Sequence, residues 1–397
     1  MESTAVSVPG RAHVAVFNVP MAGHVVPTLG VVRELVDRGH RVSYAVTPEF
    51  ESQVRAVGAE PVVYDSPPQG EAPEDMAQGV TGVLGVNLGA LPQLEAAYAG
   101  DRPDVVLYDV YAWAGPLLAA QWKIPVVQLA PTHIPYDGLV QDFFGLADIS
   151  LIPGFPELAQ ALASFGVPGG VHALTLAPPR CVAFFPKRFQ RRAHTVRAGE
   201  VHWVGPVIGD RSFQGRWRAP EGAGQVVYVS LGSQFNRRPE FYRTCVEALA
   251  GPGRHVVLSV GEEVARTGIG PVPAGVEVYA GVPQMDVLAA ASVFVTHGGM
   301  GSVMEALSAG VPMVVVPQMA EQRVNAEQVR DLGVGTYLPR EEVTADALRE
   351  AVLALGSDER VAGAVARMRE EIEAAGGAAA AAQVVEKVLA DCPLAAR

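Results

Sequence analysis

Two strand–helix units follow one another between residues 281 and 325, and this pattern constrains the fold more than any other part of the chain. Residues 292–296 form a short apolar run typical of a buried strand, and residues 303–308 read as the start of a helix. A second apolar run at 313–316 is followed by a polar loop at 317–322 and another helical segment. Strands that alternate with helices pair in parallel, because each helix crosses back over the sheet. The segment therefore predicts part of a doubly wound α/β sheet.

The turn between the first strand and its helix, HGGMGS at residues 297–302, is rich in glycine. Such a turn presents unpaired backbone N–H groups at the positive end of a helix, which favours a phosphate. The polar loop at 317–322 leaves the same carboxyl edge of the sheet, where open α/β sheets bind ligands. Together they predict a nucleotide-sugar site. The glycines do not fit G-x-G-x-x-G, and the acidic residue that a dinucleotide ribose requires about 20 positions later is missing. NAD-dependent oxidoreduction is therefore disfavoured.

The same alternation of strands and helices extends over most of the 397 residues. Further apolar strand runs lie at residues 13–19, 41–47, 104–108, 125–129 and 226–230. We expect residues 1–207 to form an N-terminal Rossmann-like domain, 208–224 a linker, and 225–397 a second Rossmann-like domain with a helical tail. If the two domains face one another, the carboxyl ends of both sets of strands border one cleft.

Composition limits the partners and the location of the protein. A net charge of −12 argues against non-specific nucleic-acid binding, so local features must hold an anionic ligand. Three isolated cysteines predict neither a disulfide framework nor a zinc site. No run approaches the roughly 18 apolar residues that a membrane-spanning helix needs, and the N-terminus lacks the features of a signal peptide. We expect a cytoplasmic monomer or homodimer without nucleic-acid or membrane partners.

Two residues that could form a catalytic base stand at the carboxyl edge of the first predicted sheet. His24 lies in the loop after the first strand, and Asp109 follows the strand at 104–108. If they are in contact, the carboxylate would orient the imidazole and stabilise the imidazolium that forms when the ring removes a proton. Each residue also has an ordinary explanation, as a solvated loop histidine and a helix-capping aspartate. Spacing alone leaves both explanations open.

His297 and Ser233 are candidates for phosphate contact. His297 stands at the glycine turn and could donate to a pyrophosphate oxygen, or it could simply bond to backbone at the end of a strand. Ser233 lies in the loop after the strand at 226–230, where serines are also common for reasons of turn geometry. Position favours a functional role for His297 more than for Ser233.

Four further polar residues could contact the ribose and the sugar. Ser302 and Glu305 are spaced for ligand contact, but they also match a capping box, in which both side chains satisfy N–H groups of their own helix. Glu321 and Gln322 could read sugar hydroxyls, or they could form an ordinary solvated helix start. The residue pattern does not decide between these alternatives.

Four stretches resemble a known family of enzymes. Residues 282–322, VPQMDVLAAASVFVTHGGMGSVMEALSAGVPMVVVPQMAEQ, are similar to the donor signature of glycosyltransferases with the GT-B fold of two Rossmann-like domains. The stretches GPVIGDRSFQGRW and YVSLGSQFNRRPEFYRTCVEAL resemble the bacterial macrolide glycosyltransferases of the oleandomycin type. The N-terminal stretch VPMAGHVVPTLGVVRELVDRGHRVSYAVTPEF is similar to the same group, so the resemblance covers nearly the whole chain.

The resemblance implies a role for each candidate residue. His24 matches the catalytic base of the family and Asp109 its partner carboxylate. His297 and Ser302 match residues that hold the pyrophosphate, and Glu305 matches the residue that binds the ribose hydroxyls. The donor-binding residues implied in this way, together with Ser233 from the spacing argument, are Ser233, Val282, Gln284, His297, Gly299, Gly301, Ser302, Glu305, Glu321 and Gln322.

The resemblance also implies a reaction. Family members transfer glucose from UDP-glucose to a hydroxyl of a macrolide or similar polyketide, often inactivating an antibiotic, and we expect inversion at the anomeric carbon without a metal. Phe143 and Phe144 are candidates for contact with the apolar acceptor. The chain departs from the family at Gly281, where a tryptophan usually stacks on uracil. This departure leaves the choice between a UDP and a dTDP donor open.

Three other functions stay open at this point. A dTDP-deoxysugar transferase of polyketide biosynthesis differs from the expected enzyme only in its donor. A sugar-nucleotide epimerase on the same fold needs no apolar acceptor pocket, and the apolar residues around 143–144 and 151–165 argue against it. A non-catalytic partner of a biosynthetic transferase needs no base, so the pair His24 and Asp109 argues against that function.

Overall fold

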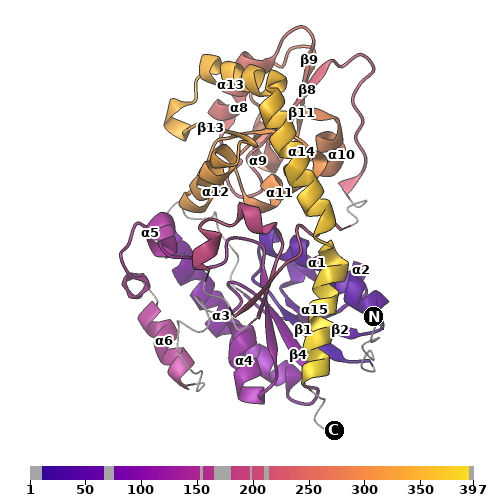
Figure 1. Ribbon diagram of the computed structural model, residues 1–397, viewed down its shortest axis with the longest axis vertical. Helices are drawn as coiled ribbons and strands as arrows, with labels where there is room; N and C mark the ends of the chain where they lie inside the picture. The colour runs from indigo at the N-terminus through magenta and orange to yellow at the C-terminus, as the bar shows by residue number, and fades with distance from the viewer. Residues whose placement is uncertain are drawn as a thin grey trace.

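The computed structural model describes residues 11–66, 76–152, 155–164, 180–196, 199–209 and 214–392, and it has two lobes (Figure 1). Each lobe is built on one parallel sheet with apolar cores on both faces. Within the described residues, the first sheet has seven strands in the order β3-β2-β1-β4-β5-β6-β7, and the second has six in the order β10-β9-β8-β11-β12-β13. The predicted architecture of two doubly wound α/β domains is confirmed.

The N-terminal lobe follows the apolar pattern of the sequence. Its central strands are buried almost throughout, as expected for strands covered on both faces. The strands are β1 (His13–Phe17), β2 (Arg41–Val46), β3 (Glu60–Val63), β4 (Val105–Asp109), β5 (Val126–Ala130), β6 (Arg180–Ala183) and β7 (Glu200–Trp203). The helices are α1 (Ala22–Asp37), α2 (Glu51–Ala56), α3 (Met76–Tyr98), α4 (Ala114–Trp122), α5 (Leu139–Phe144) and α6 (Phe155–Ser164), with 3₁₀ turns at Pro48–Phe50, Ile149–Leu151, Lys187–Phe189 and Ala193–Thr195.

The C-terminal lobe repeats this plan. Its strands are β8 (Gln225–Ser230), β9 (Arg254–Ser259), β10 (Val276–Tyr279), β11 (Ala291–Thr296), β12 (Met313–Val315) and β13 (Gly335–Tyr337). Its helices are α8 (Pro239–Leu249), α9 (Gly261–Thr267), α10 (Gln284–Ala290), α11 (Met300–Ala309), α12 (Ala320–Asp331), α13 (Ala345–Ser357) and α14 (Glu359–Ala374), with a 3₁₀ turn at Arg340–Glu342. The helix after the glycine turn begins three residues earlier than predicted, because only Gly298 of this turn has a left-handed backbone (φ +83°), while Gly299 is the N-cap and Gly301 lies within the helix.

The last helix returns to the first lobe. Figure 1 shows α14 leaving the upper lobe and α15 (Gly377–Asp391) lying along α1 of the lower one. Val385 and Leu389 are buried in the core beneath α1, and Arg38 Nη1 lies 2.8 Å from Glu386 Oε2. At the crossing, the Gly377 N–H donates to the Val204 carbonyl at 2.8 Å. The helical tail predicted for the second domain therefore ends by packing on the first.

The second half of the predicted linker is held by the C-terminal lobe. The Trp217 backbone N–H donates to Asp286 Oδ2 at 3.1 Å, and its indole Nε1–H donates to Glu277 Oε2 at 3.0 Å. These contacts fix residues 214–224 beside α10 and β10. Gln214, at the start of this segment, lines the cavity between the lobes.

Candidate active site

His24 and Asp109 are in contact at the carboxyl edge of the first sheet. The His24 Nδ1 atom lies 2.8 Å from Asp109 Oδ2, and the Asp109 side chain is fully buried. Asp109 does not cap the following helix, since α4 begins at Ala114; its Oδ1 accepts the Tyr111 N–H at 2.9 Å. His24 lies in the first turn of α1, not in the predicted loop, because the helix begins directly after Met21. The arrangement matches the dyad and neither of the ordinary explanations.

The electrostatic environment keeps the His24 ring basic. Burial lowers the pKa of His24, but the Asp109 carboxylate, through its charge and its hydrogen bond, and Glu321 raise it, and the net shift is upward. Because Nδ1–H donates to the carboxylate, Nε2 of the neutral ring is the atom that can accept a proton. The Tyr111 ring, 5.3 Å from the imidazole between centroids, covers one side of it.

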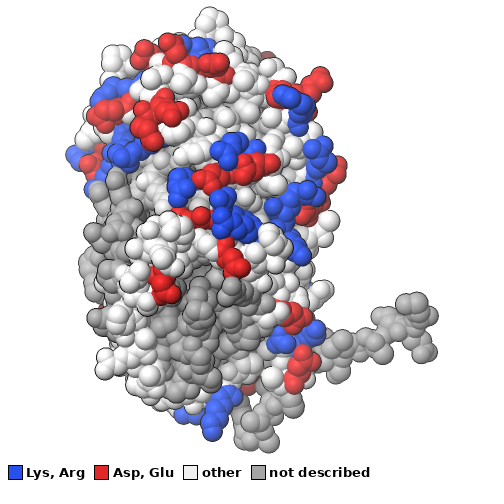
Figure 2. Space-filling model, turned by 60° about the vertical axis from the view of Figure 1, so that its left-hand side comes forward, with Lys and Arg blue, Asp and Glu red and all other residues white. Residues whose placement is uncertain are grey.

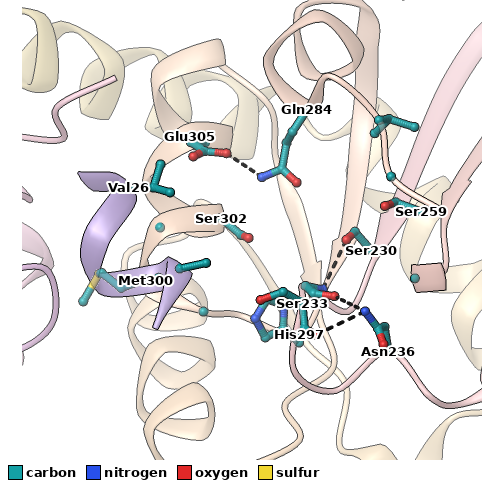
Figure 3. Close-up of a pocket in the computed structure, with 18 of the residues that line it drawn as sticks. Val26, Ser230, Ser233, Asn236, Ser259, Gln284, His297, Met300, Ser302 and Glu305 are labelled. Carbon is teal, nitrogen blue, oxygen red and sulfur yellow. Dashed lines mark hydrogen bonds between the residues drawn. The ribbon is translucent and has the colours of Figure 1, made fainter. Parts of the chain in front are cut away.

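A cavity of about 750 Å³ lies between the lobes and takes side chains from both. This volume is within the range of about 300–1,000 Å³ usual for small-molecule sites. His24 and Val26 border it from α1, and Ser302 and Glu305 border it from α11 (Figure 3). The predicted donor-binding residues on the lining are Ser233, Val282, Gln284, His297, Gly299, Gly301, Ser302, Glu305 and Glu321. The predicted base and the predicted donor residues therefore share one cavity.

The N-terminus of α11 opens into this cavity. Gly299 is the N-cap residue, and no side chain caps the helix there. Ser302 is the third residue of α11, so the alternative of a Ser302–Glu305 capping box is wrong. Its side chain borders the cavity instead (Figure 3). Unpaired N–H groups and a hydroxyl at a positive helix end form a suitable seat for a pyrophosphate.

The His297 ring is held in place by the glycines around it. A Cβ atom at Gly232 would lie 2.6 Å from Cε1 of the ring, and a Cβ atom at Gly299 would lie 2.5 Å from Nε2. Burial lowers the pKa of His297 to about 4, against a smaller opposite effect of the Ser230 backbone. The ring is therefore neutral near pH 7 and can offer an anion one N–H donor but no positive charge. The helix end must supply most of the electrostatic stabilisation of a phosphate.

Gln284 links the Glu305 carboxylate to the second sheet. Its Nε2–H donates to Glu305 Oε2 at 2.5 Å (Figure 3). Its Oε1 accepts the hydroxyl of Tyr228 at 3.0 Å. Glu305 is 6% exposed and borders the cavity. A carboxylate held in this way can accept hydrogen bonds from a vicinal diol such as that of a ribose.

Three predicted residues lie away from the cavity. Gln322 is 4% exposed, and its Oε1 accepts the Gln318 N–H at 2.8 Å. Consecutive helical residues point about 100° apart, so α12 directs Glu321 to the cavity and Gln322 to this loop. Phe143 is buried, and Phe144 packs against the core of the N-terminal lobe. Neither phenylalanine is on the lining, while residues 153, 154 and 165 of the apolar segment 151–165 lie outside the described part of the chain.

The comparisons with known proteins cover nearly the whole chain. It is 39% identical over 393 residues to the oleandomycin glycosyltransferase of Streptomyces antibioticus, with 95% of this chain and 91% of that protein covered. It is 35% identical to the NDP-glycosyltransferase YjiC of Bacillus subtilis (strain 168), with 95% and 97% covered. The crystal structure of the glycosyltransferase of kitacinnamycin matches with a TM-score of 0.85 and 40% identity, over 96% of this chain and 99% of that one. The chain belongs to the macrolide glycosyltransferases.

A family model agrees with this assignment. Residues 244–390 of the glycosyltransferase match the family described as erythromycin biosynthesis protein CIII-like, C-terminal domain. The match includes all of α11 and α12, the two helices that carry Ser302, Glu305 and Glu321. The resemblance stated from the sequence is confirmed, and the chain is an enzyme of the NDP-sugar-dependent transferase class.

Two residues that were not predicted from the sequence, Thr132 and Asn236, also line the cavity of the transferase. The Thr132 hydroxyl donates to Glu321 Oε1 at 2.7 Å, across the boundary between the lobes. Thr132 lies two residues after the end of β5. The principle that ligands bind at the carboxyl ends of parallel strands, which indicated Asp109, would therefore also have indicated Thr132. No sequence pattern indicated Asn236. Its Nδ2–H donates to the Gly232 carbonyl, within a loop whose shape the sequence does not specify.

Two further observations concern ligands and location. Gly281 borders the cavity, and a Cβ atom there would have no neighbour within 4 Å. Within the described residues, no group of three or more His, Cys, Asp and Glu side chains is arranged to hold a metal, and no helix is long and apolar enough to cross a membrane. The metal-free mechanism and the cytoplasmic location stay predictions.

We predict that Gly299→Ala expels the His297 ring from its slot. The backbone at Gly299 (φ −59°) accepts alanine, so the conflict is with the imidazole alone. Release from burial removes the cause of the low pKa, and the pKa of His297 should rise from about 4 toward the ordinary 6.5. An NMR titration of the histidine rings between pH 7 and 5 measures this. Gly301→Ala, whose Cβ has no neighbour within 4 Å, is the control. An unchanged His297 titration in Gly299→Ala would contradict the packing described here.

Proposed function

We propose that this glycosyltransferase moves a hexose, glucose from UDP-glucose, to a hydroxyl of a macrolide or related polyketide, inverting the anomeric centre. One observation carries the proposal: His24, hydrogen-bonded to the buried Asp109, borders the same cavity as the N-terminus of α11. The base His24 lies on one side of the cavity, and the helix N-terminus that can bind a phosphate lies on the other. A sugar nucleotide bound between them would have its anomeric carbon within reach of an activated acceptor.

The chain's own residues account for each proton and charge in such a transfer. The acceptor oxygen attacks the anomeric carbon while His24 Nε2 takes the hydroxyl proton, and the buried Asp109 carboxylate stabilises the imidazolium that forms. The bond from the anomeric carbon to the diphosphate oxygen breaks, and its electron pair leaves with the nucleotide. Ser302 and the N-terminus of α11 stabilise that charge. Attack from the face opposite the leaving group turns an α-linked donor into a β-glycoside.

The relatives support a nucleotide-sugar donor and leave its details to the proposal. One is named an oleandomycin glycosyltransferase and another an NDP-glycosyltransferase, and the second name specifies no nucleotide. Glu305, held by Gln284, suits the ribose that both UDP and GDP sugars carry, since a deoxyribose offers one hydroxyl fewer. We therefore favour UDP over dTDP. Inactivation of an antibiotic by glucosylation is the role that we assign to the reaction, and transfer of a dTDP-deoxysugar in biosynthesis is the alternative.

The test is glucosyl transfer from UDP-glucose to a panel of macrolides and aromatic polyketides, followed by mass spectrometry. Wild-type protein should add one hexosyl unit. His24→Ala should lower kcat by about 10²–10⁴-fold, the usual contribution of a positioned base, while the Kd for UDP-glucose stays within about twofold. His194→Ala, at an exposed position, is the matched control. Equal loss of donor binding and turnover in His24→Ala would assign that residue a structural role and overturn the mechanism.

The pH profile should depend on Asp109. The base works only when neutral, so kcat/KM should fall as pH drops through the raised pKa of His24. In Asp109→Asn the charge that raises this pKa is lost while burial, which lowers it, stays. The acidic limb should therefore move to lower pH, and the rate at the plateau should fall. A limb that keeps its position in Asp109→Asn would show that another group controls it.

Gly281→Trp should strengthen nucleotide binding. The position borders the cavity and has open space for a side chain, and stacking of a base on an aromatic ring contributes about 1–3 kcal/mol. We expect the Kd for UDP, measured by calorimetry, to fall by about tenfold or more. Gly281→Ala adds a side chain without a ring and should leave the Kd unchanged. If both variants bind UDP like the wild type, the nucleobase lies elsewhere in the cavity.

A further inference from the structure

Helix α12 joins the donor region to the N-terminal lobe along one of its faces. Glu321, near its start, accepts the Thr132 hydroxyl, and Gln328, two turns later, donates from Nε2 to the Phe189 carbonyl at 3.1 Å. Arg323, on the flank of this face, donates to the Asp142 carbonyl at 2.8 Å. Figure 2 shows acidic and basic side chains intermingled at mid-height on this side, where the lobes meet. The middle of the face is formed by Asn325, between Glu321 and Gln328.

The Asn325 carboxamide is held at one end by the glycine turn at residues 297–302. Asn325 is fully buried, and its Nδ2–H donates to the Gly298 carbonyl at 2.8 Å. The carbonyl can only accept, so this bond fixes which end of the amide faces the turn. Oδ1 then points away from Gly298, and it has no hydrogen-bond partner within the described residues. Gly298 has a left-handed backbone (φ +83°) and lies between His297 and the start of α11. The orientation of its peptide therefore sets the positions of the His297 ring and of the N–H groups at the start of α11.

Among the described residues, His133 has a buried N–H donor without a partner, whereas Asn325 has a buried acceptor without one. It is 3% exposed, and its ring stacks on Phe189 with an interplanar angle of 4°. Nδ1 accepts the Arg191 N–H at 3.4 Å, which requires that the proton of the neutral ring be on Nε2. Nε2 also has no partner within the described residues. Burial lowers the pKa of His133 to about 4, and the Asn325 side chain is the largest opposing influence, which places the two side chains close together at the boundary.

We propose that His133 is a positioning residue of the donor site: its Nε2–H pairs with Asn325 Oδ1, and Asn325 in turn holds the Gly298 peptide. The proposal rests on the proposed function, because it assumes that the turn at Gly298 binds the donor diphosphate. Pairing satisfies a buried donor and a buried acceptor at once, and leaving such groups unpaired is costly. His133 belongs to the N-terminal lobe and Gly298 to the C-terminal one. Contact between the lobes and the conformation of the glycine turn that binds the diphosphate are then thermodynamically coupled.

His133→Phe is the direct test, because it keeps a ring to stack on Phe189 and removes the Nε2–H donor. It also removes the Nδ1 acceptor, whose hydrogen bond from the Arg191 N–H is long at 3.4 Å. By calorimetry its Kd for UDP should rise by about tenfold, the cost of leaving a buried acceptor unpaired. The KM for the acceptor should stay within about twofold. His133→Gln, which keeps an N–H group at the Nε2 position, should recover most of the affinity. Arg188→Met breaks another contact between the lobes, the ion pair with Glu371 at 2.9 Å, and is the control that should bind UDP like the wild type.

A double-mutant cycle separates positioning from simple packing. Asn325→Ala should weaken UDP binding at least as much as His133→Phe, and His133→Phe should add nothing further in the Asn325→Ala background. Additive losses, or a His133→Phe variant that binds UDP normally or raises only the acceptor KM, would overturn the proposal. Should His133→Phe fail to fold, normal UDP binding by Asn325→Ala would overturn it equally. A wild type that binds neither UDP nor dTDP would defeat the proposed function as well, whereas normal wild-type binding with unaffected variants would defeat this inference alone.

Discussion

The parallel pairing of β1 with β4 is the constraint on which the active site depends. The register places Phe17 beside Tyr108, so both strands end at the same level and the residues after them meet at one edge. The short turn into α1 then brings His24 over the last residue of β4, Asp109. In the second sheet, β8 and β11 end level in the same way, with Ser230 beside Thr296. The cavity lies between the two edges, and most of its lining comes from the loops and helix starts that follow strand ends.

Three histidines border the junction of the lobes, and their surroundings give them different chemistry. Burial acts on all three. Only His24 has a buried carboxylate against its ring, and only its pKa rises. His133 and His297 have no such partner, and burial lowers the pKa of each to about 4. The site therefore has one basic ring at the acceptor side and neutral N–H donors elsewhere, which keeps the proton-accepting role on a single residue.

The sequence predicted the elements and most of the site, because strand ends in a parallel sheet have a fixed place. That rule was sufficient for His24, Asp109, His297 and Ser302. It failed where a side chain's direction depends on where a helix begins: α11 begins before Ser302, which removes the capping box, and α12 turns Gln322 away from the cavity. It also could not place Phe143, whose burial follows from the packing of α5. Nor could apolar periodicity show that α15 belongs to the first core, since an amphipathic helix fits either lobe.

The crossing of α15 has a mechanical consequence. The chain passes between the lobes once after β7 and once before α15, and the bond from Gly377 to the Val204 carbonyl ties these two passages together at one point. Gly205 and Gly376, both with left-handed backbones, stand on either side of this bond. The lobes can rotate about this tied point but cannot slide apart at it. Any such rotation changes the contacts of α12 with the N-terminal lobe, and with them the distance between His24 and the start of α11.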